Sequence, residues 1–152
     1  MVDWKLNLGN YFEELRILQE SHQEAVDNFQ QFCEFIAEPA FESLEEEFKQ
    51  YAIRSKIRHQ RGKSIALSIN FPRSRIENLQ YIIVLPKRSL ELRLVLKIRG
   101  RNNKSSPFQE KEQPFMGKIP PREILKLEKI ALIQDVIEHF RHFNFEAYTS
   151  AE

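Results

Sequence analysis

Two stretches of the chain, SIALSINF at residues 64–71 and LELRLVLKIR at residues 90–99, alternate apolar with polar or basic side chains. Successive side chains of a β-strand point to opposite faces of the sheet, so this period of two predicts two half-buried strands. Runs at residues 53–60 and 80–85 extend the pattern, and the second of them is apolar on both faces. We therefore predict a four-stranded antiparallel meander over residues 53–99, with the doubly apolar strand in the interior of the sheet.

The segments on either side of this predicted sheet have the spacing of amphipathic helices. Residues 1–52 are predicted to be helical. A long helix is expected over residues 10–37, and Pro39 is expected to end or kink it. A second helix with an acidic outer surface is expected after this proline. Residues 100–119 lack periodicity and predict a mobile loop, with a short extra strand near Phe115 as the alternative. Residues 120–145 predict one long C-terminal helix. The predicted fold class is α+β, with the helices packed on the apolar face of the sheet.

The composition is that of one ordinary globular domain. A chain of 152 residues can bury enough surface to fold without disulfide bonds or a metal ion, so we predict a single domain over residues 1–152. Cys33 is the only cysteine, which excludes an internal disulfide and predicts a reducing, cytoplasmic location. No apolar run approaches the ~20 residues of a membrane-spanning helix, so we expect no membrane partner.

The long first helix carries a heptad pattern of apolar residues. One core position is taken by Leu8, Leu15, His22, Phe29 and Ile36, and the other by Tyr11, Leu18, Ala25 and Phe32. Such a helix would be roughly 40 Å long, about the width of the domain, so part of its stripe is expected to need a partner outside the domain. The alternative is that the whole stripe lies on the chain's own sheet and last helix, because it is wider than a strict coiled-coil seam. The predicted protein interface comprises Leu15, Leu18, His22, Ala25, Phe29 and Phe32.

Charge is strongly segregated along the chain. The net charge is −9 over residues 1–50, +12 over residues 51–104 and −2 over residues 105–152, although the whole chain carries only +1. The basic sheet could bind an anionic partner, or it could be neutralised by an acidic helix of the same subunit or of its twin.

A nucleic acid is the anionic partner that such basic strands could contact. The candidate contact residues are Arg54, Lys56, Arg58, Arg93, Lys97, Arg99, Arg101 and Lys104. Two considerations weaken this interpretation. In the predicted register the outward strand positions carry no aromatic residue on which bases could stack, and lysine or arginine on edge strands also protects a sheet against aggregation.

No motif in the sequence predicts catalysis, a metal site or a cofactor. Gly62-Lys63-Ser64 has the end of a phosphate-binding loop, but the position of the required earlier glycine is Ile57, and a strand rather than a helix follows. His139 and His142 could share one side of the last helix, but no cluster with metal-ligand spacing accompanies them. The sequence therefore predicts no catalytic residue, no metal and no cofactor.

The leading functional hypothesis is a non-enzymatic cytoplasmic protein-interaction module. It would self-associate, or dock on a partner protein, through its long amphipathic helices. The first alternative is a nucleic-acid-binding protein that uses the basic sheet face. A weaker alternative is a small-ligand-binding protein or enzyme subunit with its site between the helices and the sheet.

Overall fold

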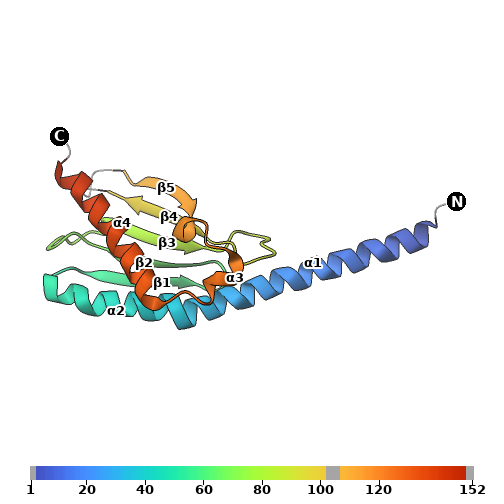
Figure 1. Ribbon diagram of the computed structural model, residues 1–152. Coiled ribbons are helices and arrows are strands. Elements are labelled where there is room, and N and C mark those ends of the chain that lie inside the picture. The colour runs from blue at the N-terminus through green and yellow to red at the C-terminus, as the bar shows by residue number, and fades with distance from the viewer. Residues whose placement is uncertain (1–2, 102–106, 150–152) are drawn as a thin grey trace.

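The protein, described here from a computed structural model, is a five-stranded antiparallel sheet with helices on one face and one helix that extends far beyond the sheet (Figure 1). The structure describes residues 3–101 and 107–149, with side chains up to Phe143. The helical elements are α1 (Trp4–Phe32), the π-helical η1 (Cys33–Ala37), α2 (Glu38–Phe48), the 3-10 turns η2 (Lys49–Tyr51) and η3 (Phe115–Gly117), α3 (Pro121–Ile124) and α4 (Lys129–Thr149). The strands are β1 (Ser55–Gln60), β2 (Ser64–Ile69), β3 (Leu79–Val84), β4 (Val95–Gly100) and β5 (Gln109–Pro114).

The first helix begins earlier and continues further than its sequence pattern predicts. Asp3 caps it, because its carboxylate accepts the backbone N–H of Lys5 at 3.0 Å, so the helix starts about one and a half turns before the expected residue 10. Pro39 does not end it. The π-helical turn η1 lies directly before the proline, and the N–H of Glu38 donates five residues back to the carbonyl of Cys33. This local rearrangement accommodates the missing proline N–H, and the helix runs on into α2.

The sheet is a meander in which each strand pairs with its neighbour in the chain. The order is β1-β2-β3-β4-β5, which confirms β3, the strand with apolar residues on both faces, as the central one. Leu67 lies opposite Ile57 and Tyr81, and Tyr81 lies opposite Ile98, so these side chains point to the same face. The predicted hairpin turn between β1 and β2 is also confirmed, since Gly62 has φ +72°, a left-handed conformation that glycine adopts without strain.

Two expectations about the second half of the sheet are wrong. Residues 109–114, placed in a mobile loop by the sequence, form β5 along the edge of β4, so β4 is an interior strand. Every side chain of β5 is exposed, which is why no apolar alternation marked this strand. The predicted fourth strand also starts late, at Val95, because β3 ends at Val84 before Pro86, which has no N–H to donate to a ladder.

Helices α2 and α4 cover one face of the sheet and meet over its centre. The ring of Phe41 from α2 lies edge-on to Tyr81 at 6.1 Å, while Asp135 of α4 accepts a hydrogen bond from the same tyrosine. Phe48 and Phe140 then join the two helices at 5.7 Å. The predicted single C-terminal helix is broken at residues 125–128 into α3 and α4. Of the helices described, none combines the length and the apolar character needed to cross a membrane.

Candidate interaction surface

The apolar stripe of α1 divides into a buried half and an exposed half. Ala25, Phe29 and Phe32 lie in the chain's own core, with exposures of 2%, 0% and 0%. Phe32 packs edge-on against Phe115 at 5.7 Å. These three predicted interface residues therefore stabilise the domain itself and are not available to a partner.

His22 marks the point where the stripe leaves the domain. Its Nδ1 lies 2.9 Å from the carbonyl oxygen of Ser89, which can only accept, so the imidazole N–H donates to the connection between β3 and β4. His22 is half-buried, Leu15 is half-buried, and Leu18 is exposed. The three residues lie at the base and along the free part of the helix, where the sequence predicted an interface.

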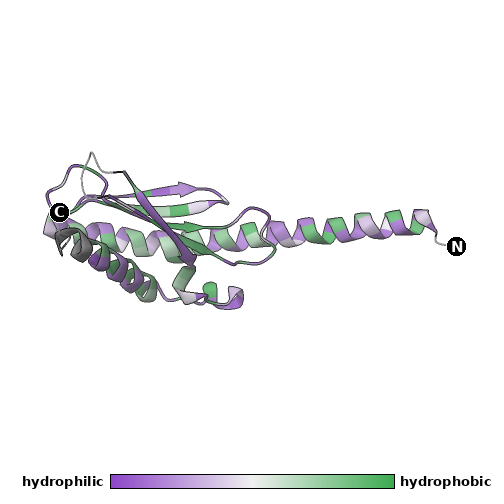
Figure 2. Cartoon of the chain, turned by 90° about the horizontal axis from the view of Figure 1, so that it is seen from above, coloured by the Kyte–Doolittle hydropathy of each residue, from purple (hydrophilic) through white to green (hydrophobic). Residues whose placement is uncertain are grey.

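The free part of α1, residues 4–21, is here called the arm. It extends beyond every other described element, as two perpendicular views show (Figures 1 and 2). At 1.5 Å per residue the arm is about 27 Å long. Its exposed large apolar residues are Trp4, Leu6, Leu8, Tyr11, Phe12, Ile17 and Leu18.

Most of these apolar residues prolong the stripe that is buried further along the helix. Trp4, which the sequence pattern had not included, adds another heptad position before Leu8. The stripe on the arm then consists of Trp4, Leu8, Tyr11, Leu15 and Leu18, with Phe12 beside it. By the 3.6-residue period, Leu6 and Ile17 fall on the opposite side of the helix.

Three charged residues of the arm, Glu13, Arg16 and Glu20, lie away from this stripe and pair with one another. Arg16 donates to Glu13 and, at 2.6 Å, to Glu20, one turn away in each direction. The guanidinium of Arg16 lowers the pKa of Glu13 through a hydrogen bond and its positive charge. All three side chains are exposed, so these pairs support the helix and leave the apolar stripe free for contact.

The fold places four of the eight predicted basic residues on the same face of the sheet. Lys56, Arg58, Lys97 and Arg99 lie on the sheet face opposite the helices, here called the outer sheet face, because they alternate with the core-facing Ile57 and Ile98. Other predicted members lie elsewhere: Arg54 precedes β1, Arg93 lies before β4 and pairs with Glu91 at 2.8 Å, Arg101 follows β4, and Lys104 lies outside the described residues.

Several of these cations form ion pairs or hydrogen bonds with neighbouring acidic and amide side chains, such as the hydrogen bond from Arg99 to the side-chain oxygen of Gln80. Arg58 pairs with Glu77 at 2.5 Å, and Arg99 lies 3.8 Å from Glu110 of β5. In the register of β4 and β5, Lys97 is directly opposite Glu112. β5, which the sequence pattern did not mark as a strand, therefore supplies negative charge beside the basic residues of β4.

Within the subunit, the acidic helix α2 is not the partner of the basic strands. It packs on the other face of the sheet, and its Glu46 pairs with Lys49 of the following turn at 3.4 Å. Glu45 is partly covered, and this burial raises its pKa. The expectation of charge complementarity within the subunit is met by Glu77 and β5 instead.

One aromatic residue does lie beside the outer sheet face, contrary to the sequence-based expectation. The guanidinium carbons of Arg99 and Arg101 lie 4.7 and 4.4 Å from the centroid of Phe108, which precedes β5. Cation–π contacts of this kind occupy the ring with two protein cations. The sequence could not place Phe108 here without knowledge of β5.

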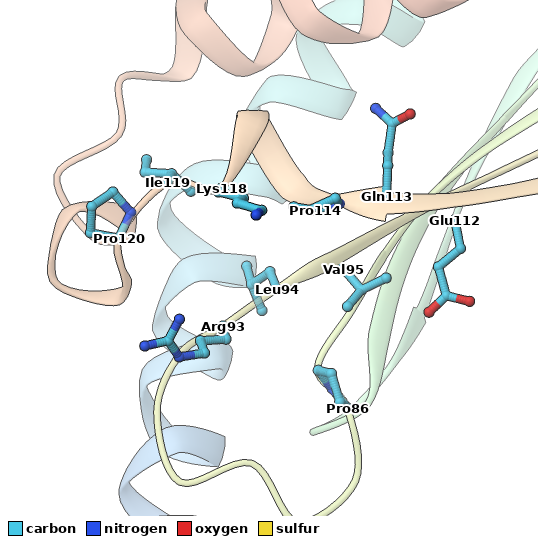
Figure 3. Close-up of a pocket in the computed structure, with 10 residues that line it drawn as sticks. All are labelled: Pro86, Arg93, Leu94, Val95, Glu112, Gln113, Pro114, Lys118, Ile119 and Pro120. Carbon is cyan, nitrogen blue, oxygen red and sulfur yellow. The ribbon is translucent and has the colours of Figure 1, made fainter.

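An open cleft of about 530 Å³ lies at one end of the sheet (Figure 3). Leu94 and Val95 lie between Pro86 on one side and the chain leaving β5, with Pro114, on the other (Figure 3). The remaining lining residues are Arg93, Glu112, Gln113, Lys118, Ile119 and Pro120. This lining is mainly apolar and offers no histidine, cysteine or hydroxyl nucleophile.

A polar cluster of the buried Tyr81 with the half-buried Asp135 and His139 joins α4 to the centre of the sheet. The hydroxyl of Tyr81 donates to the Asp135 carboxylate at 2.5 Å, and Nε2 of His139 lies 3.6 Å from the same oxygen. Burial, followed by the charge of Asp135, raises the pKa of Tyr81 well above its ordinary value, so the phenol stays protonated. The cluster is a satisfied structural contact, and His142 nearby is exposed.

The remaining candidate groups are a possible metal cluster and the Cys33 thiol. Among the side chains that the structure describes, no group of three or more histidine, cysteine, aspartate or glutamate residues could hold a metal ion. Burial raises the pKa of the Cys33 thiol to about 12, which keeps it protonated and unreactive. Comparison of the chain with protein-family models, with curated proteins and with solved structures gave no match in any of the three.

Proposed function

We propose that the protein is a non-enzymatic, cytoplasmic protein-interaction module that associates through the arm of α1. The observation that carries this proposal is the continuity of one apolar stripe. It is buried in the domain core at Phe29 and Phe32 and continues in the same register from Leu18 back to Trp4, where Leu15 is half-buried and Trp4, Leu8, Tyr11 and Leu18 are exposed. The apolar side chains on the arm are favourably removed from water just as those in the core are, and coiled-coil-like packing against another helix would bury them.

The apolar area on the arm is large enough to support association. Trp4, Tyr11 and Phe12 are 67%, 56% and 57% exposed. Aromatic side chains of this kind bury about 150–250 Å² each, so covering these three at ~25 cal/mol per Å² gives on the order of 10 kcal/mol before the cost of association. Partners that cover the leucines as well gain further area.

Another protein suits the arm better than a lipid surface does. Helices that lie on membranes usually carry a polar face rich in lysine and arginine, which anionic headgroups attract. The arm has Glu13, Glu14 and Glu20 against Lys5 and Arg16, so its polar face is acidic on balance.

The test is the native mass of the chain by light scattering, from low to high micromolar concentration. The wild type is expected to associate, and the double variant Leu15→Glu, Leu18→Glu is expected to shift towards the monomer without unfolding the domain. Leu6→Glu with Ile17→Glu is the matched control, because it adds the same two charges on the opposite side of the arm. A wild type that stays monomeric at high micromolar concentration removes the self-associating form of the proposal.

Nucleic-acid binding is a second candidate, favoured by the contacts that Arg99 and Arg101 make with the ring of Phe108 beside the outer sheet face. It ranks lower because Glu77 and Glu110 neutralise neighbouring cations. If it is correct, binding to a single-stranded oligonucleotide falls steeply with salt, and Lys97→Gln with Arg99→Gln flattens the log–log slope by up to about two units. Absence of binding at low salt rejects it.

A small-ligand-binding protein or enzyme subunit is the weakest candidate. The cleft around Leu94 and Val95 is the place where a small apolar ligand would fit (Figure 3). Ligand-induced changes in the signals of these two residues, in a screen by nuclear magnetic resonance, would support it.

A further inference from the structure

We infer that the arm's partner is a second copy of this chain, bound antiparallel, so that the two arms lie side by side and the two domains lie at opposite ends. This inference rests on the proposed function, which it deepens by naming the partner and its direction. Three features of the described residues carry it: the symmetry of the stripe, the position of the domain, and an exposed leucine, Leu90, in a cleft at the base of the arm.

The stripe has the same spacing when read in either direction. Its positions on the arm and at its base are 4, 8, 11, 15, 18 and 22, with steps of four, three, four, three and four. An antiparallel copy centred on residue 13 therefore places Leu8 opposite Leu18 of the second copy and Tyr11 opposite Leu15. The four inner layers then pair apolar with apolar, as knobs-into-holes packing requires, and the two outer layers pair Trp4 with His22.

The position of the domain excludes a parallel pair over the same length. From Ala25 onward the stripe is covered by the chain's own core. In a parallel pair both domains would lie at the same end and on the inner side of the two helices, where they would collide. An antiparallel pair avoids this collision because each domain lies beyond the end of the other arm.

The base of the arm offers a receiving surface for the end of a second arm. The hydrogen bond from His22 to Ser89 holds the connection between β3 and β4 against the helix, and Leu90 in that connection is 47% exposed. Leu90 lines a cleft of about 220 Å³ with Ala25, Leu92 and Pro121, and Glu24, Glu91 and Arg122 add charged side chains to its lining. In the antiparallel register Trp4 of the second copy lies opposite His22, about one turn from Ala25, where it can cover Leu90.

Few charged residues lie beside the stripe, so little charge repulsion opposes the pairing of two copies. Glu13, Arg16 and Glu20 lie on the far side and bond to one another. Glu14 is the acidic residue that flanks the stripe near its centre, and it would lie near Glu14 of the second copy. This is one exposed like-charge contact, which salt screens.

Cysteine cross-linking tests the direction. Leu8→Cys and Leu18→Cys are made in separate chains, mixed, and oxidised gently; both positions are exposed, and the buried Cys33 thiol does not compete. The antiparallel pair gives a cross-linked dimer in the mixture at a yield at least tenfold above that of either variant alone. Arg16→Cys, on the far side of the arm, is the control for random collision.

The other outcomes separate this inference from the proposed function. Efficient cross-linking of Leu8→Cys with itself shows a parallel pair and overturns the inference, while the interaction module stands. A dimer by native mass that gives no cross-link in the mixture also overturns it. A monomer at high micromolar concentration removes both the inference and the self-associating form of the proposal.

Trp4 provides a second readout, because it is the only tryptophan in the chain. As the concentration rises through the dissociation constant, its fluorescence emission is expected to shift to shorter wavelength as the indole leaves water. Leu90→Glu is expected to reduce this shift, and Leu6→Glu, on the opposite side of the arm, to leave it unchanged. A dimer in which the emission of Trp4 does not move contradicts the docking at Leu90.

Discussion

The two halves of α1 have the same heptad spacing but different surroundings. From Ala25 to Phe32 the stripe is buried by packing against the sheet and η3. In the arm most of the same stripe is exposed to solvent. Leu15 and Phe29 occupy equivalent positions of the repeat, yet one is half-buried and the other fully buried. Periodicity therefore reports which face of a helix is apolar, and it does not report what covers that face.

The largest expected difference in stability is between two variants that each replace one phenylalanine of α1 with alanine, one in the core and one on the arm. Phe29→Ala removes a fully buried ring and is expected to lower the free energy of unfolding by about 3–5 kcal/mol. Phe12→Ala, on the arm, is expected to leave the unfolding of the dilute monomer within about 0.5 kcal/mol of wild type. Urea denaturation at low protein concentration measures both, and similar losses in the two variants would mean that the arm folds against the domain.

Glycine substitutions sharpen the same comparison at a smaller scale. A Cβ on Gly100 would lie 2.3 Å from the ring of Phe143, so Gly100→Ala is expected to cost about 1–3 kcal/mol by overpacking. A Cβ on Gly9 meets nothing within 4 Å, so Gly9→Ala is expected to increase helix content and to stabilise the arm by about 0.5–1 kcal/mol. Circular dichroism with thermal unfolding measures both variants. If Gly9→Ala lowered the stability, Gly9 would have to lie in a contact of the arm that the single chain does not show.

Stability at high pH depends on Tyr81 in the body of the protein. Because burial raises its pKa in the folded state, the folded chain keeps the phenol proton above pH 10 while the unfolded chain releases it. The unfolded state then binds fewer protons, so stability falls as pH rises above 10. Tyr81→Phe is expected to reduce this fall and, by leaving Asp135 without its donor, to lower stability at neutral pH by about 1–3 kcal/mol. An unchanged pH slope in urea titrations at pH 9 and 11 would contradict this role.

The smallest effect is expected on the acidic surface of α2. Because α2 lies on the sheet face away from Lys56 and Arg99, changing Glu42, Glu45, Glu46 and Glu47 to glutamine removes crowded like charges and breaks one exposed pair with Lys49. The melting temperature at low ionic strength is expected to stay the same or rise slightly, with the difference erased by salt. A clear fall would show that these carboxylates bind cations of a second subunit.

The sequence by itself determined the α+β class, the central place of β3, the hairpin at Gly62 and the apolar face of α1. Each of these follows from a local preference: a period of two, a period of 3.6, or a residue tolerant of positive φ. Only the tertiary structure decided the strand at residues 109–114, because a polar edge strand joins the sheet through its backbone and leaves no apolar pattern. It alone also decided that the stripe leaves the core at His22, since the reach of the sheet along α1 depends on contacts between residues far apart in the chain.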